Sequence, residues 1–80
     1  MDWSRVKKAS ADFDAVVNKK MAPEDACEDA NIMLAALMYC DAKWIADAPK
    51  EQRKAMLERV YKPFQDDVKD MVGLIVKGQI

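Results

Sequence analysis

The sequence predicts an all-α protein, an antiparallel three-helix bundle whose third helix is long and is kinked or split at Pro63. Apolar residues recur at steps of three and four along three segments, which is the spacing of one helix face. Glycine occurs only twice, and β-branched residues never alternate with polar ones, so no segment has the pattern of a strand. Pro23 and Pro49 are each followed by charged residues, as at the first position of a helix.

The first helix is expected over about residues 3–20. Its apolar stripe is formed by Val6, Ala9, Phe13, Val16 and Val17. The opposite face is polar and holds Lys7, Lys8, Asp12, Asn18 and Lys19. This helix is therefore expected to cover a core with one side only.

The second helix is expected over about residues 23–47, and it is apolar on nearly all sides. Its main apolar face holds Cys27, Ala30, Leu34, Leu37, Met38, Trp44, Ile45 and Ala48. The other side is mostly covered by Ile32, Ala35, Ala36, Tyr39 and Ala46. A helix of this kind is typical of the centre of a bundle.

The third helix is expected over about residues 50–77. Its stripe keeps one helical phase across Pro63 and consists of Leu57, Val60, Tyr61, Phe64, Val68, Met71, Val72 and Ile75. We therefore expect one long helix that bends at Pro63. The alternative is a break into two helices, because proline removes a backbone hydrogen bond and disfavours helical geometry in the residue before it. Gly78 is expected to end the helix.

Short connections between these helices favour an antiparallel up-down-up arrangement. At 1.5 Å per residue, the first helix would be about 27 Å long and the others about 37 and 42 Å, so the first helix cannot cover both partners. One end of the core would stay open, and we expect this end to bind a partner. The predicted contact surface consists of Met38, Tyr39, Asp41, Trp44, Ile45, Met56 and Val60.

Asp41 is the unusual member of this surface. Helical projection places it in the middle of the main apolar face, between Leu37 and Trp44. A buried carboxylate needs a partner, so we expect a salt bridge to a lysine or arginine at the open end. The alternative is a polar contact from Asp41 to another protein.

The 80 residues are enough for a single helical domain, over residues 1–80. Cys27 and Cys40 would lie about 20 Å apart on one helix, too far for a disulfide. The chain has no histidine for a zinc site, its first residues lack the apolar stretch of a secretory signal, and its longest apolar run, residues 32–40, is too short to span a membrane. These features predict a cytoplasmic protein with no metal, no cofactor and no membrane association.

No combination of residues predicts catalysis, so we expect that the chain is not an enzyme. Ser4 and Ser10 have no histidine base, and neither cysteine lies in an activating motif. Two acidic clusters resemble metal-ligand sets, Glu24, Asp25, Glu28 and Asp29 in one, and Asp66, Asp67 and Asp70 in the other. Calcium loops need a glycine-containing turn and di-metal sites in bundles need histidine, so we interpret both clusters as solvated helix faces.

The open apolar end and these exclusions predict a small non-catalytic interaction module. It would act as an adaptor, an assembly factor or an inhibitor of a protein partner, and would self-associate as a homo-oligomer. Tryptophan, tyrosine and methionine are residue types that interfaces use, and the predicted surface holds all three. Phages and other mobile elements are one source of such chains, although no residue identifies the origin.

Two alternatives of other classes stay open. A nucleic-acid-associated regulator could use the mixed basic face formed by Lys50, Arg53, Lys54 and Arg59. Acidic residues dilute this face and the net charge is −1, so nucleic acid is the less favoured partner. A binder of a small anion or nucleotide, at a helix N-terminus or an oligomer seam, could use Arg5, Lys7 or Lys50, but no glycine-rich loop supports it.

Overall fold

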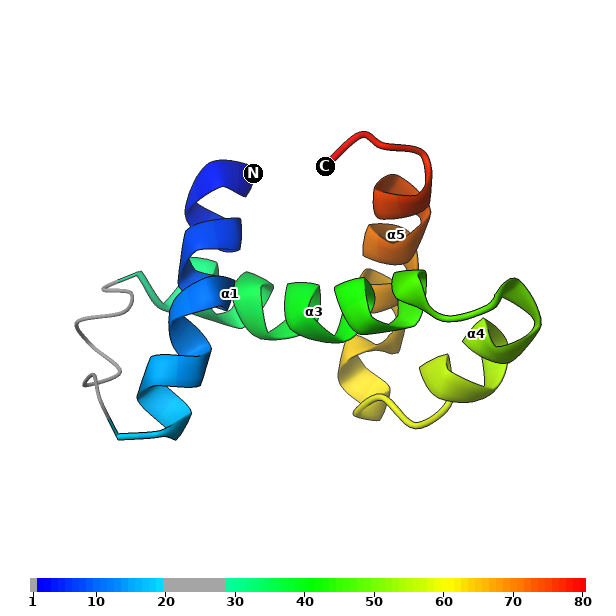
Figure 1. Ribbon diagram of the computed structural model, residues 1–80, viewed down its shortest axis with the longest axis horizontal. Coiled ribbons are helices and arrows are strands. Elements are labelled where there is room, and N and C mark those ends of the chain that lie inside the picture. The colour runs from blue at the N-terminus through cyan, green and yellow to red at the C-terminus, as the bar shows by residue number, and fades with distance from the viewer. Residues whose placement is uncertain (1, 20–28) are drawn as a thin grey trace. The chain divides into compact units, whose positions relative to one another are not determined.

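The computed structural model describes residues 2–19 and 29–80 (Figure 1). These residues form helices joined by short turns, and none of them lies in a strand, which confirms the all-α class. The elements are α1 (Trp3–Val17), α3 (Ala30–Asp47), α4 (Lys50–Leu57), the short 3-10 helix η1 (Lys62–Phe64) and α5 (Gln65–Val76). No described helix is both long enough and apolar enough to cross a membrane.

The chain divides into two compact units, and the boundary falls inside α3. Unit 1 is Met1–Leu37 and unit 2 is Met38–Ile80. A single domain over residues 1–80 and the antiparallel packing of three helices stay predictions.

In unit 1, α1 starts at Trp3, as expected. The Asp2 carboxylate accepts a hydrogen bond from the backbone N–H of Arg5 at 3.3 Å, which satisfies one of the unpaired donors of the first turn. Val6 and Ala9, two residues of the predicted stripe, are buried. The helix ends at Val17 rather than near residue 20, because Lys19 takes a left-handed conformation with φ of 59° that a helix cannot include.

The start of α3 corrects the expected boundary of the second helix. Asp29 is not helical, and its Oδ1 atom accepts hydrogen bonds from the backbone N–H groups of Asn31 at 2.9 Å and Ile32 at 3.4 Å. This is N-capping, and it begins a helix at Ala30, so one uninterrupted helix over residues 23–47 is wrong. The predicted starting position at Pro23 lies outside the described residues.

The two sides of α3 also differ from the expectation. Its buried side carries Ile32, Ala35, Ala36, Tyr39, Ala42 and Ile45. Of the residues predicted to form the main apolar face, Leu34, Leu37 and Trp44 are exposed, whereas Met38 and Ile45 are buried. Asp41 explains the choice, because it lies on the exposed side and burying its carboxylate would cost more than exposing the leucines.

In unit 2, the third predicted helix is split rather than kinked. It ends at Leu57, and Tyr61 is extended, with φ of −48° and ψ of 123°. Pro63 lies near the start of η1, where its missing N–H leaves no hydrogen bond unmade. A continuous helix would have lost that bond and placed the proline ring against the carbonyl of Arg59. The long kinked helix over residues 50–77 is therefore wrong, and the alternative of two helices is correct.

The last helix, α5, packs on η1 and α4 and supplies Val68 and Met71 to the core of unit 2. Its end confirms the predicted stop at Gly78, which has a φ of 72°. The N–H of Gly78 donates to the carbonyl of Ile75 at 3.0 Å, and that of Gln79 donates to Leu74 at 2.9 Å. These two bonds form a Schellman cap, which requires a left-handed residue and so favours glycine.

Candidate functional site

The most exposed apolar side chain of α3 is Trp44, which retains 61% of its accessible surface. It lies in the last turns of the helix, beside the Ala48–Pro49 connection to α4. A shallow groove is formed there, and its lining residues are Trp44, Asp47, Ala48, Gln52, Met56 and Arg59. We call this set the Trp44 groove. All of its residues belong to unit 2.

The Trp44 groove combines apolar side chains with two opposite charges. Trp44 and Met56 supply the apolar area, and Asp47 and Arg59 supply one carboxylate and one guanidinium. Neither charged side chain has an ion pair among the described residues. Both therefore present a charge that another molecule can neutralise.

The structure brings together only part of the predicted contact surface. Trp44 and Met56 lie in one groove, but Met38, Tyr39 and Ile45 are buried. Val60 is half-buried in the turn that follows α4. The buried residues cannot contact a partner unless unit 2 rearranges.

Asp41 is exposed, which corrects its predicted burial in an apolar face. It has no ion pair within residues 2–19 and 29–80, so the expected salt bridge is not found there. A carboxylate in water needs no partner, which is the physical reason. A contact from Asp41 to another protein stays a prediction.

The four basic residues of the nucleic-acid alternative are divided between different surroundings. Arg59 lies in the Trp44 groove, whereas Arg53 and Lys54 line a separate cavity. Lys50 is exposed at the first position of α4. Arg5 and Lys7, the candidates for an anion site, are exposed on α1 of unit 1.

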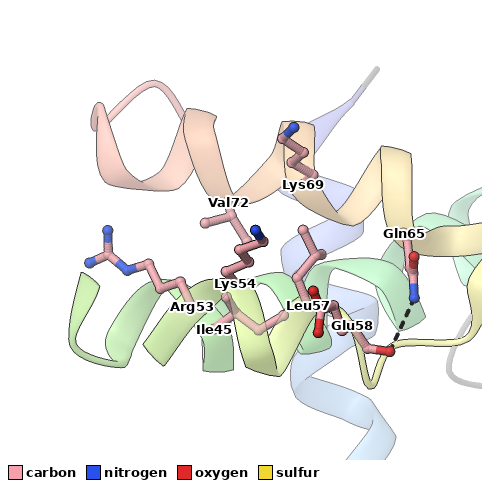
Figure 2. A pocket seen from close by; sticks show the side chains of 8 residues that line it. All are labelled: Ile45, Arg53, Lys54, Leu57, Glu58, Gln65, Lys69 and Val72. Atoms are coloured by element: carbon pink, nitrogen blue, oxygen red, sulfur yellow. Dashed lines mark hydrogen bonds between the residues drawn. The ribbon is translucent and has the colours of Figure 1, made fainter. Parts of the chain in front are cut away.

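The separate cavity lies between the C-terminal end of α3, α4 and α5, and Figure 2 shows its lining. It has a volume of about 440 Å³. Its apolar floor comes from Ile45 of α3, Leu57 of α4 and Val72 of α5. The polar residues around the floor are Arg53, Lys54, Glu58, Gln65 and Lys69. We call it the α4–α5 cavity.

Two polar side chains at opposite ends of the α4–α5 cavity are fixed by hydrogen bonds to the backbone (Figure 2). Arg53 donates from Nε to the carbonyl of Ala48 and from Nη2 to that of Ala46, both at 3.1 Å. These carbonyls lie at the end of α3, where no helical N–H follows to pair with them. Arg53 therefore links the end of α3 to α4.

At the other end of the cavity, Gln65 pairs with backbone carbonyls in the same way as Arg53. Its Nε2 atom donates to the carbonyls of Glu58 at 3.2 Å and Val60 at 3.0 Å, which the end of α4 leaves without helical partners. The first residue of α5 is thereby linked to the turn after α4. The neighbouring rings of Tyr61 and Phe64 meet edge to face, with centroids 5.2 Å apart. The connection between α4 and α5 is held at several points.

The α4–α5 cavity is not predicted by the sequence, and neither is a site role for five of its lining residues, Leu57, Glu58, Gln65, Lys69 and Val72. One signal in the sequence could have indicated how α4 is linked to α5. It is Gln65, a polar residue close after Pro63. Uncapped carbonyls are expected wherever a helix is interrupted, and a nearby amide can pair with them.

No group of three or more possible metal ligands occurs among residues 2–19 and 29–80. Within the acidic clusters, Asp29 caps α3, and Asp66, Asp67 and Asp70 are exposed on α5. Glu24, Asp25, Glu28 and the cysteine Cys27 lie outside the described residues, and so does any prediction that depends on them.

Comparison with known proteins gives no relative from which a function could be transferred. No protein-family model, no curated protein and no solved structure matches the chain.

Proposed function

We propose that this chain is a small protein-interaction module that binds through the Trp44 groove. The observation that carries the proposal is the 61% exposure of Trp44, next to Met56 and Arg59 in one groove. An exposed indole ring costs free energy in water, and covering it with another protein recovers that cost. Tryptophan and arginine are also the residues that most often dominate binding energy at interfaces.

A second copy of the chain is the partner that the groove fits best. In an interface with two-fold symmetry, residue i of one copy contacts residue j of the other, and j contacts i. A patch that carries one acid and one base beside apolar side chains is then complementary to itself. The Trp44 groove has this composition, with Asp47 and Arg59 beside Trp44 and Met56. Each Asp47 would pair with the partner's Arg59.

Replacing Trp44 with glutamine is expected to weaken self-association by about tenfold or more, because aromatic residues at the centre of an interface contribute the most to binding. Sedimentation velocity over a range of concentrations measures the dimer dissociation constant. The matched control is Val76→Gln, which also replaces an exposed apolar side chain of unit 2 by the same amide, outside the groove. Val76→Gln should leave the dissociation constant unchanged. A wild-type chain that stays monomeric at every concentration would contradict self-association.

Exchanging the two charges of the groove tests the symmetry of the proposed dimer. Asp47→Arg and Arg59→Asp should each weaken self-association, because each variant places like charges opposite one another twice. Mixing the two variants should restore dimers, since one copy then carries two bases and the other two acids. Sedimentation of each variant alone and of an equimolar mixture measures this. Dimers that are insensitive to both substitutions, or a mixture that does not recover, would rule out the pairing of Asp47 with Arg59.

The finer features expected from the sequence belong to the same proposal. They are a role as adaptor, assembly factor or inhibitor, a cytoplasmic location, an antiparallel arrangement of the helices and an origin in a phage or other mobile element. The groove supports only the first of these. The nucleic-acid alternative is less favoured, because Arg53 uses its guanidinium to cap α3 and Arg59 lies beside Trp44 rather than with the other bases.

A further inference from the structure

The α4–α5 cavity has the size and the lining of a small-molecule site. Pockets for small ligands generally enclose about 300–1,000 Å³ and combine an apolar lining with a few placed polar groups. The α4–α5 cavity, at about 440 Å³, falls within that range. It shares no lining residue with the Trp44 groove, so a ligand here would be independent of the proposed partner site.

The floor of the cavity is apolar and comes from three helices. Ile45 lines this space but is almost completely buried, at 1% exposure, so Leu57 and Val72 supply the surface that a ligand can reach (Figure 2). A ligand that covers this floor must itself have an apolar body, because a fully hydrated group would lose water without compensation. The floor therefore selects against inorganic ions and against sugars.

The charges around the floor favour an anion. Three bases line the cavity, Arg53, Lys54 and Lys69, against one acid, Glu58. Lys54 extends across the cavity toward Val72, whereas the side chain of Lys69 is directed away from the other lining residues (Figure 2). Neither lysine has an ion pair among the described residues. The ammonium group of Lys54 is therefore available in the cavity to an incoming carboxylate.

The two ends of the cavity are held by hydrogen bonds to the backbone. Arg53 is held by two backbone carbonyls at one end and Gln65 by two at the other. A site whose walls are fixed beforehand loses less conformational entropy on binding. The guanidinium of Arg53 uses two of its donors for these carbonyls, so Lys54 supplies most of the attraction for an anion.

From these observations we infer that the α4–α5 cavity binds a free amphiphilic monoanion, a small molecule with an aliphatic body and one carboxylate. The aliphatic body lies on Leu57 and Val72, next to the buried Ile45, and the carboxylate is directed to Lys54. A polyanion such as a nucleic acid has no apolar body for the floor. The proposal does not depend on self-association.

Decanoate, below the concentration at which it forms micelles, is a suitable probe. Titration of the full chain, followed by methyl NMR signals, should shift the signals of Ile45, Leu57 and Val72 along a one-to-one binding curve. Binding should weaken as salt is raised, because the lysines are exposed to solvent. Decyltrimethylammonium has a comparable aliphatic chain and the opposite charge, and it should bind more weakly than decanoate.

Three variants test the role of the charges. Lys54→Gln should weaken decanoate binding by about two- to fivefold, the range for exposed ion pairs, and Lys69→Gln should weaken it less, because its ammonium is directed away from the cavity. Glu58→Gln should strengthen it, because the only carboxylate of the cavity is removed. Lys43→Gln is the control, since Lys43 is an exposed lysine of α3 outside the cavity, and it should have no effect.

The proposal would be overturned by absence of methyl shifts with decanoate, by equal affinity for the cationic probe, or by equal effects of Lys43→Gln and Lys54→Gln. It would also be overturned if the same methyl signals shifted with protein concentration alone, because a second copy would then cover the cavity. A strict monomer that binds decanoate with the expected charge dependence would support this proposal while contradicting self-association.

Discussion

An Ile45→Ala variant is expected to lose about 2–5 kcal/mol of its free energy of unfolding, the usual cost of truncating a buried isoleucine. Ile45 is 1% exposed and is one of the largest fully buried side chains among the described residues. Its removal leaves a void beside Leu57 and Val72, which the helices can fill only in part. Urea unfolding followed by far-ultraviolet circular dichroism measures the change.

The matched control is Leu37→Ala, a truncation of similar size on the exposed side of the same helix. Leu37 retains 46% of its accessible surface, so its truncation should cost less than about 1 kcal/mol. If Ile45→Ala does not fold, Ile45→Val provides the comparison, with an expected loss of about 0.5–1.5 kcal/mol. A larger loss for Leu37→Ala than for Ile45→Ala would mean that the buried side of α3 has been assigned incorrectly.

Local signals in the sequence were sufficient for the class and for several helix ends. Gly78 ends α5 because its left-handed conformation is open to glycine without a steric penalty. α4 starts at Lys50, as expected from the proline signal, although Pro49 is the residue before the helix rather than its first residue. These features depend on one residue and its immediate neighbours, which are visible in the sequence.

Two features that depend on contacts between residues distant in sequence could not be predicted from local signals. They are the buried side of α3 and the break before Pro63. α3 is apolar on both sides, so the periodicity alone could not select the buried one. The decision depended on a single carboxylate, Asp41, and on the core that the other helices offer. The same holds for the break before Pro63, where the stripe of apolar residues keeps its phase although the helix does not continue.

The candidate sites show the same difference. Trp44 and Met56 were predicted to share a surface, and they do line one groove, since a large apolar residue near a helix end is visible from the sequence. Arg59 is predicted on a different surface, the basic face. It lines the same groove as Trp44 because of the path of the chain between α3 and α4, which helical periodicity does not reveal. The α4–α5 cavity was missed because its lining comes from three helices separated in sequence.

Arg53→Gln is expected to lower the free energy of unfolding by about 1–3 kcal/mol, because two carbonyls at the end of α3 lose a charged donor. The control Lys50→Gln also removes a positive charge from α4. Because Lys50 is exposed, its replacement should change the free energy of unfolding by no more than about 0.5 kcal/mol. Arg53→Lys should fall between them, since an ammonium keeps the charge but lacks the planar fork that reaches both carbonyls. Urea unfolding of the three variants gives this order.

The same variants separate two interpretations of Arg53. If its main role is to cap α3, stability falls in Arg53→Gln, and affinity for duplex DNA at low salt is the same as in Lys50→Gln. If Arg53 instead belongs to a nucleic-acid surface, its replacement lowers the affinity for DNA with little change in stability. The slope of log affinity against log salt concentration then becomes shallower by about one, the value for one lost phosphate contact. Because the guanidinium of Arg53 already donates to Ala46 and Ala48, we expect the first outcome. Equal stability of Arg53→Gln and Lys50→Gln would show that the two hydrogen bonds do not stabilise the link between α3 and α4.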